Sequence, residues 1–149
     1  MQATTASRTA THSARRAITT MYVGLVVSAL LAVLTFVDQV AVGDITDALW
    51  DEYPDYTGGE IDTEAGAAAA ALYVLAALGI VCWLWLATAT RRGWGRTRLI
   101  STIVFVLAVV GSMSMAYVPL PGYLATAHWL PCVVGLVALV MLWIPTTKD

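Results

Sequence analysis

The chain has 149 residues, of which 59% are hydrophobic and only 12% are charged. A soluble domain of this size carries roughly a quarter charged residues, and a single small core has too little volume to bury so much apolar side chain. Composition therefore excludes an ordinary soluble domain. We expect the lipid bilayer, and no nucleic acid, as a partner.

The charged residues are sorted along the chain. All eight basic residues lie in the N-terminal tail, in the segment 91–98 or near the C-terminus, whereas nine of the ten acids lie between Asp38 and Glu64. Loops rich in Lys and Arg remain on the cytoplasmic side of a membrane. The pattern predicts a multi-pass protein of the plasma (inner) membrane with both termini in the cytoplasm and the acidic segment outside.

Residues 1–17 are rich in Thr, Ser and Ala without apolar periodicity, so we expect a mobile cytoplasmic tail. The apolar run that follows is long enough to cross about 30 Å of hydrocarbon, and it predicts a first membrane helix over 18–42. Arg15 and Arg16 before this run also suit a cleaved signal peptide. The run is longer than the apolar region of such a peptide, so we retain it as a helix.

Residues 43–65 form an acidic outer loop with eight acids and no basic residue. Within it, Ile45, Leu49 and Tyr53 recur every fourth residue, which predicts a short helix lying on the membrane surface. Pro54 is expected to end this helix.

Gly58 and Gly59 predict a turn before the second membrane helix. The rest of the chain alternates long apolar runs with short breaks, and we place residues 18–149 in one membrane domain. The predicted fold class is all-α, an integral membrane four-helix transmembrane bundle. Its second, third and fourth helices are expected at about 66–90, 98–118 and 123–144.

An internal duplication is an open alternative within this fold. Arg16-Ala-Ile-Thr-Thr-Met opens the first helix, and the similar Arg98-Leu-Ile-Ser-Thr-Ile opens the third. Two hairpins that enter and leave from the same side would form a parallel repeat about the membrane normal. Arg and Thr are also common at any helix end, so the similarity does not decide between the two interpretations.

Small residues recur every fourth position on two of the expected helices. Such stripes let helix backbones approach closely, which drives association inside a bilayer. We expect packing within one four-helix bundle, and a homo-oligomer interface is the alternative. The stripes consist of Gly24, Ser28 and Ala32 on the first helix and of Ala108, Ser112 and Ala116 on the third.

Three polar residues form the candidate site: Asp38 and Gln39 at the outer end of the first helix, and His128 near the start of the fourth. An ionisable group inside the bilayer is costly and marks a proton or ion site. A histidine close to Asp38 would form a pH-sensitive pair. The simpler interpretation is that these residues lie at the interface and reach water.

No motif predicts catalysis or a bound metal. Cys82 and Cys132 lack a C-x-x-C spacing, so we expect small buried hydrophobes. The segment that begins at Asp55 is similar to a calcium loop, but Glu60 stands where an EF-hand needs glycine. We therefore expect no metal, no cofactor and no enzymatic activity.

The high content of Ala, Val and Leu, with the turn Gly93-Trp94-Gly95-Arg96, resembles small four-helix integral membrane proteins of actinobacterial type. The resemblance is one of general composition over the whole chain. It implies the four-helix fold and transfers no functional residue. The function that we expect is a non-catalytic accessory or interaction subunit of a membrane complex or homo-oligomer. A small oligomeric transporter or channel is the alternative.

Overall fold

A computed structural model describes residues 3–92 and 96–143. All its regular elements in these ranges are helices, and four helical stretches are long and apolar enough to cross a membrane. The prediction of an all-α, four-helix membrane bundle is confirmed. The four stretches are Arg16–Val42, Gly58–Arg91, Thr97–Met115 and Gly122–Trp143.

The first helix, α1, runs from Ala3 to Val37 and continues as the π-helical turn η1, Asp38–Val42. The chain therefore becomes helical well before residue 18, where the sequence led us to expect the end of a tail. Each residue added to an existing helix gains a hydrogen bond at little entropic cost, and alanine is the best helix former. Extension of the membrane helix into this Ala-containing segment follows from both.

The first helix ends at Gly43. Its φ of +83° lies in the left-handed region, and its N–H donates to the Asp38 carbonyl at 2.8 Å. A side chain would strain this conformation, so glycine is required. The reversal turns the chain into α2, Asp44–Glu52.

Most of the expected acidic loop 43–65 is helical. Helix α3 begins at Gly58, not near residue 66, and ends at Arg91. Thr57 and Glu60 form a capping box in which the Thr57 N–H donates to the Glu60 carboxylate at 2.8 Å. The box satisfies the free N–H groups of the first turn, and Gly58 and Gly59 therefore start a helix where we had expected a turn.

Helix α2 does not lie apolar face down on the membrane surface. Ile45 and Leu49 are each 2% exposed, and they pack with Ile61 and Leu72 of α3 in one apolar cluster. The early start of α3 supplies the apolar partner that a surface helix would otherwise seek in lipid. We call residues 44–64, which comprise α2, the connection and the start of α3, the acidic outer cap, after the side on which the sequence predicts them.

Helix α4 covers Thr97–Met115. The expected fourth helix is two helices, α5 (Gly122–Ala127) and α6 (Leu130–Trp143), that meet at His128. Pro131 explains the break, because it has no N–H for the carbonyl four residues earlier and its ring crowds that carbonyl. The turn at 93–95 and the end of the expected helix at 144 lie outside the described residues.

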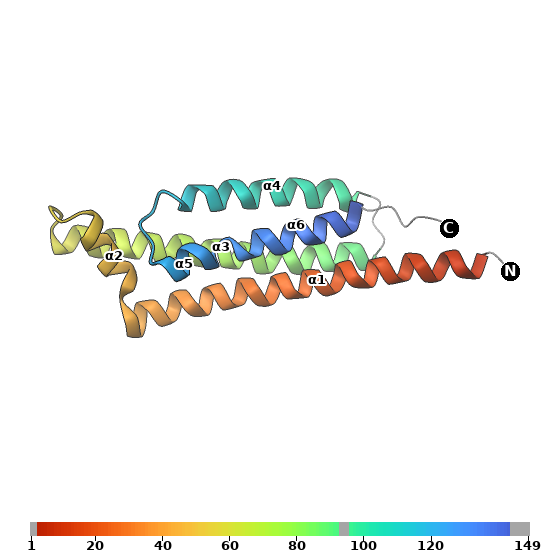
Figure 1. The fold of residues 1–149 in the computed structure, drawn as a ribbon, viewed down its shortest axis with the longest axis horizontal. Coiled ribbons are helices and arrows are strands. Elements are labelled where there is room, and N and C mark those ends of the chain that lie inside the picture. The colour runs from red at the N-terminus through yellow and green to blue at the C-terminus, as the bar shows by residue number, and fades with distance from the viewer. Residues whose placement is uncertain (1–2, 93–95, 144–149) are drawn as a thin grey trace.

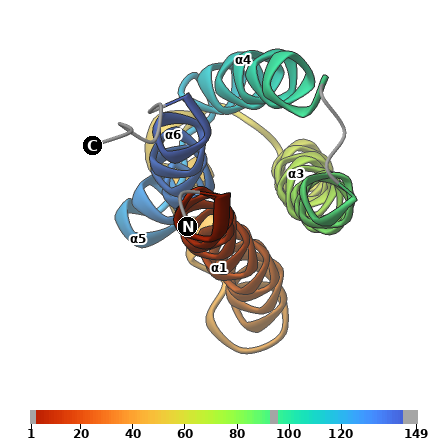
Figure 2. The same ribbon diagram turned by 90° about the vertical axis from the view of Figure 1, so that its right-hand side faces the viewer.

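The four spans form a ring when the bundle is viewed along its axis (Figure 2). Helix α1 packs against α3 and α6, and α4 completes the ring by contacting α6 and α3. The start of α1 and the end of α6 lie at one end of the bundle, and α2 lies at the other (Figure 1). The acidic outer cap is thus at the opposite end from Arg91.

The seam between α1 and α3 is the tightest part of the ring. A Cβ atom at Gly24 would lie 2.3 Å from Cε2 of Trp83, and one at Gly79 would lie 2.6 Å from Oγ of Ser28. Glycine is therefore needed at both positions. Helix α4 is held more loosely, since 11% of its apolar window is buried compared with 28% for each other span.

Candidate functional site

The ring of spans surrounds a cavity of about 320 Å³. Its wall is mostly apolar, and small residues from α3, α4 and α6 leave the space open. Cavities of this size and character are typical of small-molecule sites. The small residues in the wall are Gly79, Ala108, Gly111, Ser112, Gly135 and Ala138.

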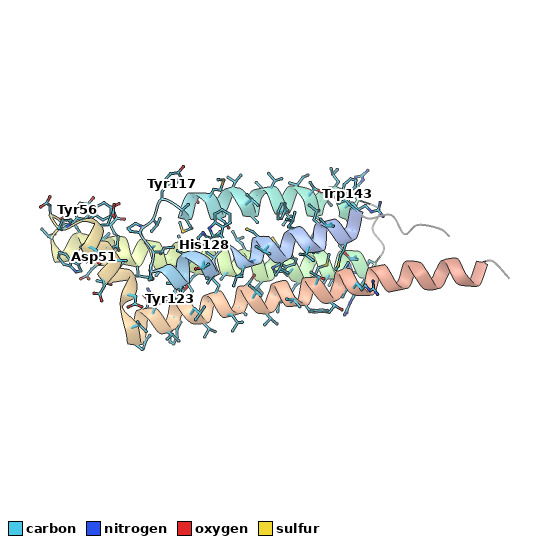
Figure 3. The ribbon with its side chains drawn as sticks, viewed as in Figure 1. Asp51, Tyr56, Tyr117, Tyr123, His128 and Trp143 are labelled. Carbon is cyan, nitrogen blue, oxygen red and sulfur yellow. The ribbon has the colours of Figure 1, made fainter. Side chains whose placement is uncertain are left out.

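His128 lines this cavity where α5 meets α6 (Figure 3) and is only 4% exposed. Its Nδ1 lies 3.2 Å from the carbonyl oxygen of Leu124. Among the described residues, Nε2 of His128 is the one buried side-chain nitrogen or oxygen without a hydrogen-bond partner. An unpaired buried acceptor costs about 1–3 kcal/mol, so this atom calls for an explanation.

The serine side chains of the cavity wall have partners. The hydroxyl of Ser112 and the thiol of Cys132 lie 3.2 Å apart. Ser101 donates its hydroxyl proton to the Thr97 carbonyl at 2.7 Å. These bonds satisfy the two serines inside the protein, whereas Nε2 of His128 is buried in the described part of the chain without a partner.

Asp38 lies elsewhere, at the end of the bundle that carries the acidic outer cap, and is only 1% exposed. Tyr123 donates its hydroxyl proton to Oδ1, and the backbone N–H of Ile45 donates to Oδ2 at 3.3 Å. The carboxyl group therefore ties α5 and α2 to the end of the first helix. Tyr123 lies on the face of α5 that is turned toward α1 (Figure 3). We call these three residues the Asp38 junction.

Gln39 points away from this junction. Its side-chain oxygen accepts a hydrogen bond from the Tyr73 hydroxyl at 3.0 Å, in an exposed position. No hydrogen bond joins Asp38 to His128 within the described part of the chain. The structure therefore places the three candidate polar residues in three environments: a buried junction, an exposed contact and a cavity wall.

Sequence reasoning missed Tyr123 as a partner of Asp38. The two residues are 85 positions apart, and tyrosine at a helix end is more often an interfacial anchor. No local pattern distinguishes the two roles. The cavity was missed as well, because residue spacing shows which side chains share a helix face and not how far away the next helix lies.

The two small-residue stripes have different surroundings. On α1, Gly24 and Ser28 face α3, and Ala32 packs against the apolar cluster that contains Ile45 and Leu49. On α4, Ala108 and Ser112 line the cavity, and Ala116, which follows the last residue of the helix, is exposed. Close helix approach thus occurs along the first stripe, whereas the second borders open space.

A search of the described residues finds no group of three or more His, Cys, Asp or Glu side chains that is arranged to hold a metal ion. Comparison with known proteins gives no match to a family model, a curated protein or a solved structure. The four apolar spans identify a small multi-pass membrane protein.

Proposed function

We propose that the protein is a non-catalytic accessory or interaction subunit of a membrane complex, and that the acidic outer cap is its contact surface. The proposal rests on the acidic outer cap because the cap combines charge of one sign with a folded, packed backbone. It contains no basic residue, and its helices are joined by the buried side chains of Ile45, Leu49 and Ile61. Its exposed acids are Asp47, Asp51, Glu52, Asp55, Glu60, Asp62 and Glu64.

A surface of this kind suits a basic partner. Clustered charge of one sign steers an oppositely charged protein and fixes its orientation. A pre-folded surface also loses less conformational entropy on binding than a mobile loop would. We therefore expect the partner to present Lys and Arg to the outer face of the membrane.

The proposed location is the plasma membrane, with both termini in the cytoplasm. Arg91 supports this orientation because it lies at the end of the bundle opposite the cap. Its guanidinium there is 5.4 Å from the centre of the Tyr22 ring. The positive-inside rule assigns such arginines to the cytoplasm. A cysteine introduced at Asp55 should react with a membrane-impermeant thiol reagent in intact cells. Labelling only after the cells are opened would show that the protein has the opposite orientation.

Charge removal at the end of α2 tests the contact surface. Asp51→Asn with Glu52→Gln removes two exposed charges, and since acids oppose the dipole at a helix C-terminus, α2 should remain folded. The matched control, Asp51→Glu with Glu52→Asp, keeps both charges. We expect gentle extraction and native mass spectrometry to show a hetero-complex for the wild type and the control, and its loss at physiological salt for the neutral variant. A complex that survives neutralisation, or a wild type without a partner after cross-linking in the membrane, would reject the proposal.

A small oligomeric transporter or channel around Asp38, Gln39 and His128 has less support. Such a protein would need its ionisable groups along one path, and these three lie in separate environments. Asp38 is closed in by Tyr123 and Ile45. The Asp38→Asn variant separates the two functions, because a transporter that uses this carboxyl group should lose flux or its pH dependence.

A further inference from the structure

We propose that the central cavity is a binding site for one lipophilic molecule that carries a hydroxyl group. The apolar part of the molecule would occupy the space among α3, α4 and α6, and the hydroxyl would donate a hydrogen bond to Nε2 of His128. This inference is independent of the acidic outer cap, since the cavity and the cap are different parts of the molecule.

The bond to Leu124 fixes which atom of the ring is available. A carbonyl oxygen only accepts hydrogen bonds, so Nδ1 of His128 must carry a proton to form the 3.2 Å contact. In a neutral imidazole Nε2 is then without a proton and acts as an acceptor. The free position therefore selects a ligand that donates, and an ether or a plain hydrocarbon cannot satisfy it.

The walls determine the rest of the ligand. Leu75, Leu78 and Leu107 line the cavity together with the small residues, and Trp83 and Phe105 contribute aromatic surface. No Lys or Arg from the described part of the chain lines it, so a carboxylate or phosphate would be left without a countercharge. These surroundings favour a neutral, membrane-soluble alcohol or phenol.

The cavity is large enough for such a molecule, and its position makes lipid the source. It is partly open, and it lies beside α4, the span with the smallest buried share. Nε2 itself is covered by neighbouring atoms, so a neighbouring side chain must move before the hydroxyl can reach it. Such rotamer changes are common at binding sites whose backbone stays fixed.

Nitrogen NMR of the histidine ring tests the proposal. The chain has two histidines, and the His12→Gln variant leaves His128 as the reporter. We would label this protein with ring-¹⁵N histidine in lipid nanodiscs and titrate dodecanol against dodecyl methyl ether, which lacks the hydroxyl proton. We expect an unprotonated Nε2 without ligand and a saturable change of its chemical shift with dodecanol. The ether is expected to bind at least about tenfold more weakly.

Three results would overturn the proposal: a proton on Nε2 in the free protein, no saturable shift with dodecanol, or equal responses to the alcohol and the ether. A second pair of variants locates the binding. Ala108→Phe puts a large side chain into the cavity. Val106→Phe is the control, because Val106 is 53% exposed on α4 and lies outside the cavity wall. Its new side chain should leave the cavity open to the ligand. We expect the dodecanol response to disappear in the first and persist in the second. A response that persists in Ala108→Phe would place the alcohol outside the cavity.

Discussion

Small residues line both the seam between α1 and α3 and the face of α4 that looks into the bundle, but their effects differ. In the seam, Gly24 lies against the Trp83 ring and Gly79 against Ser28, so that any added carbon would clash. On α4, Ala108 borders a cavity. The comparison shows that a small-residue stripe permits close approach without enforcing it. The outcome depends on whether the opposite helix presents a side chain that fills the space.

Gly24→Leu should lower the free energy of unfolding more than any other substitution in this series. A Cβ atom would already lie 2.3 Å from Trp83, and overpacking of this kind lowers the free energy of unfolding by about 3 kcal/mol. Denaturant unfolding in detergent micelles would measure the change. Gly66→Leu is the matched control, because a Cβ atom there meets nothing within 4 Å. Equal stability of the two variants would show that the seam is not tight.

The Asp38 junction holds α5 and α2 against the end of the first helix. Tyr123→Phe removes the hydroxyl that donates to Asp38 and leaves a buried carboxyl oxygen with one bond fewer, so the free energy of unfolding should fall by about 2 kcal/mol. Tyr117→Phe should change nothing measurable, because Tyr117 is 89% exposed and points away from the bundle (Figure 3). Similar unfolding curves for both variants would mean that the junction contributes no stability.

Gly79→Ala is expected to cost about 1–2 kcal/mol, since the new methyl group would lie 2.6 Å from Oγ of Ser28. Ser28→Gly should restore part of the loss by making room. A double-mutant cycle measures the coupling between the two positions. Additive effects would contradict direct packing between these residues.

Ala108→Leu should have the smallest effect of the series. Its side chain enters the cavity, so the free energy of unfolding should change by less than about 1 kcal/mol and in the stabilising direction. The same detergent unfolding assay applies. A loss as large as that of Gly24→Leu would show that α4 is packed as tightly as α1, and the contrast between the two sides would fail.

Local patterns in the sequence predicted the membrane spans but misplaced the starts of α1 and α3 and the end of α4, and they missed the break between α5 and α6. The apolar runs identify the spans because a bilayer requires about 20 apolar residues in a helix. The start of α3 could also have been found, because Thr57-Gly-Gly-Glu60 matches a capping box. We gave more weight to Gly58 and Gly59 as turn residues, and the reciprocal hydrogen bonds of the box outweigh that preference.

The candidate site depended on distances that the sequence does not contain. The hydrogen bond from Tyr123 to Asp38 joins residues far apart in the chain, and either side chain alone fits an interfacial role. His128 lies at the break between α5 and α6, and its Nδ1 lies 3.2 Å from the Leu124 carbonyl oxygen. Pro131 was visible in the sequence, but the cavity beside His128 was not.

Helix α3 is longer than one crossing of a bilayer requires. Its 34 residues extend about 50 Å, and the hydrocarbon layer takes up about 30 Å of that. The turns beyond this length include the start of the helix, where Ile61 packs with Ile45 and Leu49 of α2. Removing two turns between Glu60 and Ala68 would shorten α3 by about 11 Å and would delete Ile61, so α2 would lose its apolar partner and the cap would lose the acids Asp62 and Glu64.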